Sequence, residues 1–257
     1  MARQKLGQHF LIKGSILERI AAAVCPQREP LVIEVGPGKG ALTERLLARA
    51  DRVVAIELDE YLADLLRKKS PDRLEVVQAD VLETDLRQWG PAVVAGNLPY
   101  YISTAILSRA LAPGSLLARG AFLVQKEVAE RVTAAPGSRA YGYLSVESQL
   151  HAEVRTLFDV RPSAFHPPPK VDSALIGFKL RDRAKELAID SPAEFLKFVR
   201  LCFQHKRKTI RNNLATAYGV DAIASFPEVS LRAEQLSIEQ FAEMWKKLRG
   251  ENHLGHR

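Results

Sequence analysis

Cysteine is scarce in this chain of 257 residues, which contains only Cys25 and Cys202. The two lie far apart in the sequence, each among apolar residues, so we expect buried free thiols rather than a disulfide. The 6 histidines show no spacing typical of metal ligands. We therefore expect no metal site.

Long hydrophobic runs are also missing. No stretch approaches the roughly 18 consecutive apolar residues of a membrane-spanning helix, and the N-terminal region lacks the apolar core and small-residue cleavage site of a secretory signal. Apolar residues still make up 47% of the chain, which is enough for a packed core. We expect a cytoplasmic protein with no membrane partner, and we expect it to be a monomer.

Acidic residues are fewer than basic residues. The chain has 37 Lys and Arg against 30 Asp and Glu, a net charge of +7, and a pI of about 9.5. Residues 181–257 hold 14 basic and 10 acidic residues, whereas the much longer segment 1–180 holds 23 and 20. A basic balance favours anionic partners, of which nucleic acid is the usual one.

The order of apolar and amphipathic segments predicts an α/β fold. Short apolar runs typical of buried strands alternate with segments of helical spacing. This alternation predicts a doubly wound, mostly parallel sheet. The strands are expected at 31–35, 53–57, 74–80, 92–96 and 121–125, and the helices at 16–26, 41–50, 61–69 and 102–111.

The pattern changes toward the C-terminus. Segments 151–160 and 171–180 are typical of longer strands, which we expect as an antiparallel pair at one side of the sheet. From Asp190 onward the signals are helical, and Ser191-Pro192 is typical of a helix start. We predict a sheet domain over residues 1–185 and a small helical domain over residues 186–257.

A glycine-rich segment, Glu34 to Gly40, follows the first predicted strand. Gly36 and Gly38 allow a ligand to approach the backbone closely, and this end of a doubly wound sheet is where nucleotide-like ligands bind. The Gly-x-Gly-x-Gly spacing resembles that of class I methyltransferases and differs from the Gly-x-Gly-x-x-Gly of nicotinamide dehydrogenases. A glycine turn with no ligand is the alternative.

Acidic residues end the next two predicted strands. Glu57 is placed to accept hydrogen bonds from both hydroxyls of a ribose, and Asp80 is placed to accept one from an adenine amine. Asp59 and Asp85 rank lower because they lie beyond the strand ends, and a solvated acid is the alternative for each. Three successive strand ends together predict a site for S-adenosylmethionine.

The turn Asn97-Leu98-Pro99-Tyr100 follows the fourth predicted strand. The N6 amine of adenine is a poor nucleophile because its lone pair is delocalised into the ring. Two acceptors aimed at its hydrogens, the side-chain oxygen of Asn97 and the carbonyl of Leu98, would favour a more tetrahedral nitrogen. Tyr100 offers a face on which the base can stack. A turn around a buried tyrosine is the alternative.

Two further segments have open interpretations. Phe165 precedes the rigid run Pro167 to Pro169 and either sandwiches the target base opposite Tyr100 or caps the core. The segment from Gln204 to Asn213 is interpreted as a basic helical stretch that either contacts RNA phosphates or forms a solvated face. Its candidate RNA-binding residues are Lys206, Arg207, Lys208 and Arg211.

Taken together, these motifs resemble the KsgA-type family of ribosomal RNA small-subunit adenine N6,N6-dimethyltransferases. The resemblance implies a Rossmann-like class I methyltransferase domain, a helical RNA-binding domain, and S-adenosylmethionine as the cofactor. The implied activity is the transfer of two methyl groups to each of two adjacent adenosines near the 3′ end of small-subunit ribosomal RNA, within the immature 30S subunit during ribosome assembly. The motifs are Leu6 to Leu11, Glu34 to Gly40, Asn97 to Tyr100, Phe165 to Ser173 and Arg207 to Arg211.

The same resemblance implies roles for particular residues. His9 stands where the family often has Asn, and a histidine can still donate a hydrogen bond to the carboxylate of the methionine part. The implied catalytic residues are Asn97, Leu98, Tyr100 and Phe165, and the implied cofactor-binding residues are His9, Leu11, Gly36, Gly38, Glu57, Asp80 and Asn97.

Other functions stay open. The related enzymes that methylate large-subunit RNA and give macrolide resistance share the sheet and the Asn-x-Pro-Tyr turn, although Leu98 and the helical tail look more like the small-subunit class. Mitochondrial transcription factors of this fold act as binding proteins, but an intact glycine loop and Asn97 favour catalysis. A nicotinamide dehydrogenase is disfavoured by the glycine spacing.

Overall fold

The structure is a computed structural model that describes residues 9–68, 72–112 and 114–254. The first residues of the N-terminal motif, Leu6 to Gln8, therefore lie outside the described part. The chain divides into two compact units, which we call the sheet unit (1–129 with 153–180) and the helical unit (130–152 with 181–257).

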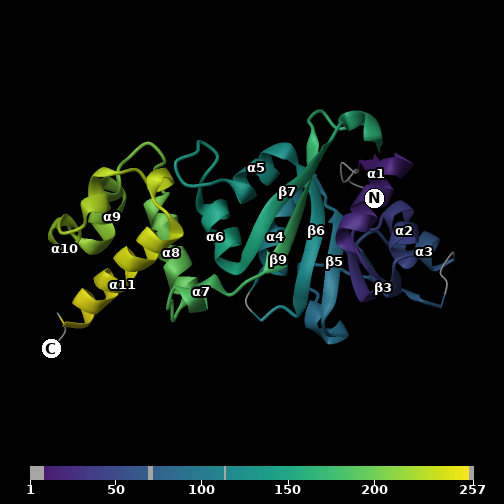
Figure 1. The fold of residues 1–257 in the computed structure, drawn as a ribbon, viewed down its shortest axis with the longest axis horizontal. Coiled ribbons are helices and arrows are strands. Elements are labelled where there is room, and N and C mark those ends of the chain that lie inside the picture. Colours follow the sequence, from purple (N-terminus) through teal and green to yellow (C-terminus); the bar gives the residue numbers. More distant parts are fainter. Residues whose placement is uncertain (1–8, 69–71, 113, 255–257) are drawn as a thin grey trace, which may run out of the picture. The chain divides into compact units, whose positions relative to one another are not determined.

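A seven-stranded sheet forms the sheet unit, in the order β4-β3-β2-β5-β6-β9-β7 (Figure 1). Neighbouring strands from β4 to β6 run parallel, whereas β9 is antiparallel to β6. The predicted doubly wound sheet is confirmed, and β9 and β7 are adjacent at one edge as expected. The strands are β2 (Glu29–Val35), β3 (Ala50–Glu57), β4 (Leu74–Gln78), β5 (Ala92–Asn97), β6 (Leu117–Gln125), β7 (Ala152–Val160) and β9 (Ser173–Leu180).

Helices connect these strands. The first helix, α1, buries Leu17, Ile20 and Val24, which recur at helical spacing and pack into the core formed with β2, β5 and β6. The helices are α1 (Gly14–Val24), α2 (Ala41–Leu47), α3 (Glu60–Arg67), α4 (Ser103–Ala110) and α5 (Lys126–Thr133), and the short 3-10 turns are η1 (Leu86–Trp89), η2 (Tyr100–Ile102) and η3 (Pro162–Ala164).

A second, two-stranded sheet joins the N-terminal segment to the loop after β7. Strand β1 (Phe10–Leu11) pairs antiparallel with β8 (Phe165–His166), so that Leu11 lies opposite Phe165. The backbone nitrogen of Ile12 also donates a hydrogen bond to the carbonyl of Ala164 at 2.9 Å. These contacts hold residues 9–12 beside the carboxyl ends of the parallel strands.

The helical unit has its own core, in which Phe195, Phe198 and Phe241 are fully buried. The expected domain boundary at 185/186 is corrected in two respects: the C-terminal part of the unit begins at Arg181, and residues 130–152 also belong to the unit. The physical reason is that Tyr141 and other apolar residues of that segment pack into the helical core. The helices are α6 (Tyr143–His151), α7 (Arg183–Glu186), α8 (Pro192–Cys202), α9 (Ile210–Tyr218), α10 (Val220–Ala224) and α11 (Ile238–Leu254), with 3-10 turns η4 (Pro227–Ser230) and η5 (Ala233–Gln235).

The segment from Gln204 to Asn213 is not a continuous helix, contrary to the sequence-based prediction. Helix α8 ends at Cys202, and α9 begins only at Ile210. The buried amide of Asn213 explains the break, because it donates to the carbonyl of Cys202 at 2.8 Å and accepts from the backbone nitrogen of His205 at 3.0 Å. We call residues 203–209 the basic loop.

Cys25 and Cys202 are both buried free thiols, as predicted. Within the described residues, no helix is long and apolar enough to cross a membrane. The same part of the chain contains no group of three or more His, Cys, Asp or Glu side chains that could hold a metal ion.

Candidate active site

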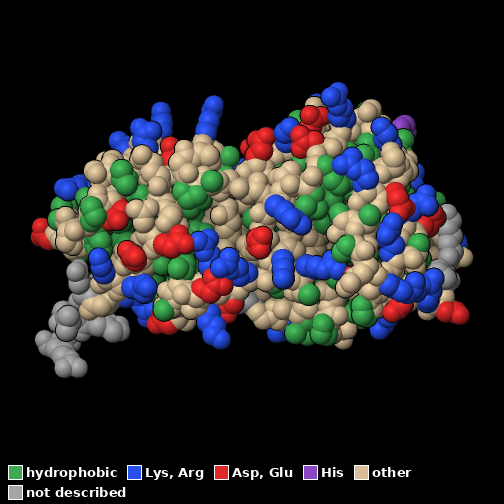
Figure 2. Space-filling model, in the orientation of Figure 1, with side chains coloured by type: hydrophobic (Ala, Val, Ile, Leu, Met, Phe, Trp, Pro, Cys, Tyr) green, Lys and Arg blue, Asp and Glu red, His purple; other side chains and the backbone are tan. Residues whose placement is uncertain are grey.

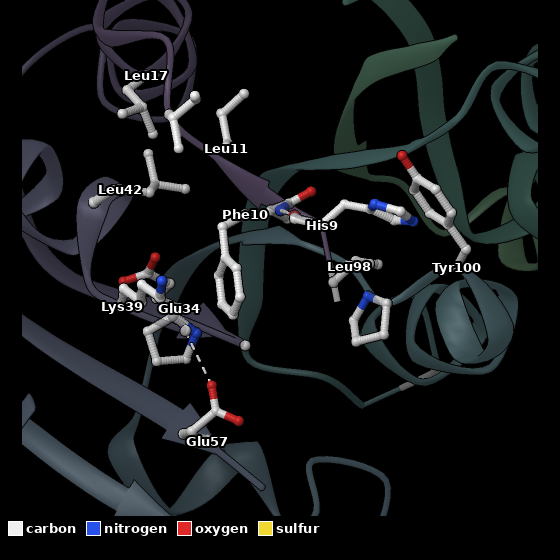
Figure 3. Close-up of a pocket in the computed structure, with 17 residues that line it drawn as sticks. His9, Phe10, Leu11, Leu17, Glu34, Lys39, Leu42, Glu57, Leu98 and Tyr100 are labelled. Atoms are coloured by element: carbon white, nitrogen blue, oxygen red, sulfur yellow. Dashed lines mark hydrogen bonds between the residues drawn. The ribbon is translucent and has the colours of Figure 1, made fainter. Parts of the chain in front are cut away.

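Two adjoining cavities lie at the carboxyl ends of β2, β3, β4 and β5. The larger, of about 320 Å³, is enclosed by the N-terminal segment, the glycine loop and the Asn97 turn (Figure 3). The smaller, of about 50 Å³, lies beyond Glu57 toward Asp80. Gly36, Glu57 and Pro99 line both cavities, so the two adjoin at these residues.

The glycine loop forms one wall of the larger cavity. Gly36 and Gly38 have φ angles of +67° and +57°, a conformation that residues with a side chain rarely adopt. A Cβ atom at Gly38 would also approach the ring of Phe10 to 3.1 Å. Phe10 lies across this loop with the ammonium of Lys39 4.7 Å from its ring centroid. Backbone conformation therefore favours glycine at both positions, and at Gly38 the space is also restricted.

Glu57 fixes the glycine loop from the end of β3. Its carboxylate accepts a hydrogen bond from the backbone nitrogen of Gly38 at 3.0 Å (Figure 3) and a second from that of Asp59, also at 3.0 Å. Burial raises the pKa of Glu57, and these N–H donors oppose the rise because they stabilise the ionised form. A buried carboxylate at this strand end is suited to accept hydrogen bonds from ribose hydroxyls, as the sequence predicts.

Asp80 lies at the smaller cavity, as its position after β4 predicted. One carboxylate oxygen accepts a hydrogen bond from the backbone nitrogen of Leu82 at 2.8 Å, which fixes the side chain. The other residues around it are mainly apolar, including Ile56, Val81 and Ile102. A mainly apolar slot with the Asp80 carboxylate at its wall fits a flat ring that carries an exocyclic amine.

Glu34, a lining residue of the larger cavity, was not among the predicted site residues. Only 1% of it is exposed, and neither its Oε2 atom nor the hydroxyl of neighbouring Thr43 has a hydrogen-bond partner in the described residues. Burial raises the pKa of the Glu34 carboxyl to about 7, and the nearby charge of Glu57 adds to the rise. The sequence feature that could have indicated this site is an acidic residue within the otherwise apolar predicted strand at residues 31–35.

This buried carboxyl predicts a pH-dependent change in stability. As the pH rises above the ordinary glutamate range, the unfolded chain loses the Glu34 proton while the folded chain keeps it up to about pH 7. Glu34 therefore destabilises the ligand-free fold increasingly between about pH 4.5 and 7, by at most about 3 kcal/mol. We expect Glu34→Gln to stabilise the protein at pH 8 and much less at pH 4.5.

Urea unfolding of both proteins at pH 4.5, 6 and 8 measures this difference. Because all other groups are unchanged, subtracting the two free energies of unfolding isolates Glu34. An equal difference at all three pH values would show that the Glu34 pKa is not raised.

Asn97 is oriented by the N-terminal segment. Its Nδ2 atom donates a hydrogen bond to the backbone carbonyl of His9 at 3.0 Å. A carbonyl can only accept, so the amide nitrogen must face it, and Oδ1 is left as the free acceptor at the cavity wall. Neither this oxygen nor the Leu98 carbonyl accepts a hydrogen bond from the described residues. The two acceptors that the sequence predicts are therefore both available.

Tyr100 follows at the same wall, with its ring facing the imidazole of His9 at a centroid distance of 5.5 Å. Its hydroxyl shares a 2.8 Å hydrogen bond with that of Ser173 in β9, and burial raises the pKa of the phenol. The Nδ1 atom of His9 lies 2.8 Å from the carbonyl oxygen of Pro167, to which it donates. His9 thus connects the Asn97 turn with the proline-rich loop; Figure 3 shows its imidazole beside the ring of Tyr100.

Phe165 does not lie where the interpretation as a base-stacking residue requires. It is 3% exposed and packs in the core of the sheet unit, and it lines neither cavity. Its pairing with Leu11 in the small sheet explains the burial, because both residues face the core there. The structure therefore corresponds to the core-capping alternative, and the ring opposite Tyr100 is that of His9.

The remaining predicted cofactor residues are brought together. His9, Leu11, Gly36, Gly38 and Asn97 line the larger cavity, and Glu57 lies between the two. The predicted RNA-binding residues belong to the helical unit, where Lys206, Arg207 and Lys208 are exposed in the basic loop and Arg211 is exposed in the first turn of α9.

Comparisons with known proteins agree over nearly the whole chain. A family model described as Ribosomal RNA adenine dimethylase matches residues 1–249. A protein of Acidobacterium capsulatum named Ribosomal RNA small subunit methyltransferase A is 43% identical, with 96% of this chain and 91% of that protein covered. A protein of the same name from Geobacter metallireducens is 41% identical, with 95% and 94% covered.

Two solved structures are also similar over almost their full length. A dimethyladenosine transferase from Plasmodium falciparum has a TM-score of 0.82 at 23% identity, with 95% of this chain and 98% of that chain covered. The 23S rRNA methyltransferase ErmE has a TM-score of 0.72 at 27% identity, with 93% and 99% covered. These likenesses confirm the predicted class I methyltransferase fold.

Proposed function

The chain belongs to the ribosomal RNA adenine dimethylase family, and we propose from this membership and the geometry above that it dimethylates the N6 amines of two adjacent adenosines near the 3′ end of small-subunit ribosomal RNA. The observation that carries the proposal is the pair of free acceptors at Asn97 and Leu98 beside a glycine-walled cavity. The relatives at 41–43% identity are named for the small subunit, and this supports that substrate over large-subunit RNA.

S-Adenosylmethionine fits the two cavities. The Oε2 atom of Glu34, which has no hydrogen-bond partner within the described residues, suits the ammonium of the methionine part. Glu57 suits the ribose, and Asp80 with its apolar neighbours suits the adenine. His9, Leu11, Gly36 and Gly38 complete the walls. When bound, the cofactor supplies a methyl group as part of a sulfonium cation, and no metal is needed for that chemistry.

The Asn97 turn prepares the acceptor amine. The Asn97 Oδ1 and the Leu98 carbonyl accept hydrogen bonds from the two N6 hydrogens, which favours a tetrahedral nitrogen whose lone pair can react. The His9 carbonyl fixes the Asn97 amide, and the backbone of Leu98 is held by the hydrogen bond from its nitrogen to the Leu123 carbonyl at 3.0 Å. Both oxygens are therefore in place before the base arrives. Neither oxygen is a strong base, and the proton released after methylation leaves to water.

The target base must leave its stack to reach this turn. Tyr100 offers one ring face, and its orientation is fixed by Ser173. We propose that the base stacks on Tyr100 and that the neighbouring imidazole of His9 forms part of the same wall. His9 then contributes to both the base site and the cofactor cavity.

A transfer assay tests the proposal. We expect purified protein with labelled S-adenosylmethionine to methylate immature small subunits that lack the modification, with dimethyladenosine as the product. Large-subunit RNA serves as the second substrate, because the ErmE structure is also similar. Labelling of large-subunit RNA alone would refute the small-subunit proposal, and labelling of neither would refute the activity.

The helical unit supplies the proposed RNA contacts. Arg207, Lys208 and Arg211 are exposed and form no ion pair within the described residues, whereas Lys206 already donates to a backbone carbonyl. Cationic side chains that are not paired with acids can bind the phosphates of RNA, and this binding releases counterions from the RNA. Binding to immature 30S subunits also fits the cytoplasmic location and monomeric state expected from the sequence, which stay predictions.

Replacing Arg207 and Lys208 together by glutamine should weaken RNA binding and flatten its salt dependence. Two lost phosphate contacts lower the slope of log K against log salt by about 1.4 to 1.8. Fluorescence anisotropy with a transcript of the 3′-terminal hairpin of small-subunit RNA, over a range of KCl concentrations, measures the slope. An unchanged slope would show that these cations are only a solvated face.

A further inference from the structure

The connection between α5 and α6, residues 134–142, lies beside the basic loop in the helical unit. Two contacts join them. The ammonium of Lys206 donates to the backbone carbonyl of Arg139 at 2.9 Å. The ring of Tyr141 packs edge-on against Phe203, with centroids 6.1 Å apart. Segments more than 60 positions apart in the sequence thus form one surface.

The α5–α6 connection has a fixed conformation at this place. The backbone nitrogen of Gly137, where φ is +84°, donates to the carbonyl of Glu234 at 2.7 Å. The hydroxyl of Ser138 donates to the carbonyl of Ala135 at 2.8 Å. Tyr141 is 0% exposed and anchors the far end of the turn in the helical core. Arg139 is therefore presented from an ordered turn.

The charge of Arg139 is uncompensated. Its side chain is exposed and forms no ion pair within the described part of the chain. Other exposed arginines of this protein are paired with acids, for example Arg28 with Asp51 and Arg87 with Asp85. Figure 2 shows Lys and Arg side chains projecting along the edge of the helical unit where, in Figure 1, the connections before α6 and before α9 lie.

We propose that Arg139 binds a backbone phosphate of the ribosomal RNA, and that Lys206 acts chiefly as a positioning residue that holds Arg139 in the same surface as Arg207 and Lys208. The proposal rests on the RNA-binding function proposed above. Arginine suits this role because its planar guanidinium can bind a phosphate through two hydrogen bonds. The ammonium of Lys206 donates a hydrogen bond to the Arg139 carbonyl, so one of its donors is not available to a phosphate.

The test uses the full chain and the same hairpin transcript. Arg139→Gln should lower the salt slope by about 0.7 to 0.9 and weaken binding roughly fourfold at 0.15 M salt. Arg139→Lys keeps a cation and should retain most of the slope. Arg28→Gln, which removes an exposed arginine already paired with Asp51, is the matched control and should leave binding unchanged.

A double-mutant cycle separates the role of Lys206 from that of Arg139. If Lys206 positions Arg139, then Lys206→Ala removes part of the slope that Arg139→Gln removes, since Gly137 and Ser138 still hold the turn, and the double variant loses no more than Arg139→Gln alone. Additive losses would show that Lys206 binds a phosphate independently and would overturn the positioning role. A wild-type slope for Arg139→Gln would overturn the phosphate contact.

These outcomes are distinguishable from failure of the proposed function. If wild-type protein binds the transcript without salt dependence, then the RNA-binding proposal itself fails. If wild-type binding is salt-dependent but Arg139→Gln matches it, only the present inference fails. Equal affinity of every variant for S-adenosylmethionine shows that the cofactor site is intact in each, because that site belongs to the sheet unit.

Discussion

Asn97→Ala should lower kcat for methyl transfer by about 100- to 1000-fold, the range found when one preorganised polar group at a reaction centre is removed. The Oδ1 atom of Asn97 is the one side-chain acceptor that we assign to the adenine amine, and the His9 carbonyl fixes its direction. The affinity for S-adenosylmethionine should change only a few-fold, because most of the cavity wall is left intact. Single-turnover rates at saturating cofactor measure the first effect, and equilibrium dialysis measures the second.

Tyr100→Phe is the matched control for this result. It removes only the hydroxyl that is bonded to Ser173 and keeps the ring on which the base stacks. We expect its kcat to stay within about fivefold of wild type, which corresponds to one ordinary hydrogen bond. Near-normal turnover of Asn97→Ala would refute the proposed role of the amide as an acceptor for the adenine amine. Equal losses in both variants would indicate a disturbed turn rather than a missing acceptor.

Glu57→Ala should raise the Kd for S-adenosylmethionine by about 100-fold or more. Hydrogen bonds to a charged group contribute about 1.5 to 3 kcal/mol each, and we expect two from the ribose. The substitution also leaves the Gly38 backbone nitrogen without its 3.0 Å acceptor, so the glycine loop loses a hydrogen bond that fixes its conformation. Isothermal titration calorimetry measures the loss, and saturating cofactor should restore much of kcat.

Asp59→Ala separates this effect from a general disturbance near α3. Asp59 caps that helix by accepting from the Leu62 backbone nitrogen at 3.1 Å, and it lines neither cavity. We expect a loss of about 1 kcal/mol in stability and an unchanged Kd for the cofactor. A similar Kd increase in both variants would indicate a general disturbance near α3 rather than the loss of ribose contacts from Glu57.

Local sequence patterns were sufficient to predict the sheet unit and to place most of the candidate cofactor residues at one edge of the sheet. Alternating apolar strands and amphipathic helices follow from side-chain periodicity, which is a local property. Parallel strands bring their carboxyl ends to one edge, so Gly36, Glu57 and Asp80 had to lie near one another once the sheet was predicted. The structure places them around two adjoining cavities.

The helical unit was predicted less well because its boundaries depend on long-range contacts. Residues 130–152 precede two strands of the sheet, yet Tyr141 packs with Phe203 and other residues of the helical core. The segment from Gln204 to Asn213 is interpreted from the sequence as helical. In the structure the buried amide of Asn213 is hydrogen-bonded to the backbone of Cys202 and His205, and the helix is interrupted. Neither packing nor a buried amide leaves a periodic signal in the sequence.

The sequence by itself determined the family, the sheet and the residue types at each strand end, because these depend on motifs and on local periodicity. Only the tertiary structure decided where Phe165 points and how strongly Glu34 is buried. It also decided which oxygen of Asn97 is free, through a carbonyl 88 positions earlier in the chain. Burial and hydrogen-bond direction are set by atoms that distant segments bring together, and these determine which predicted residues can act.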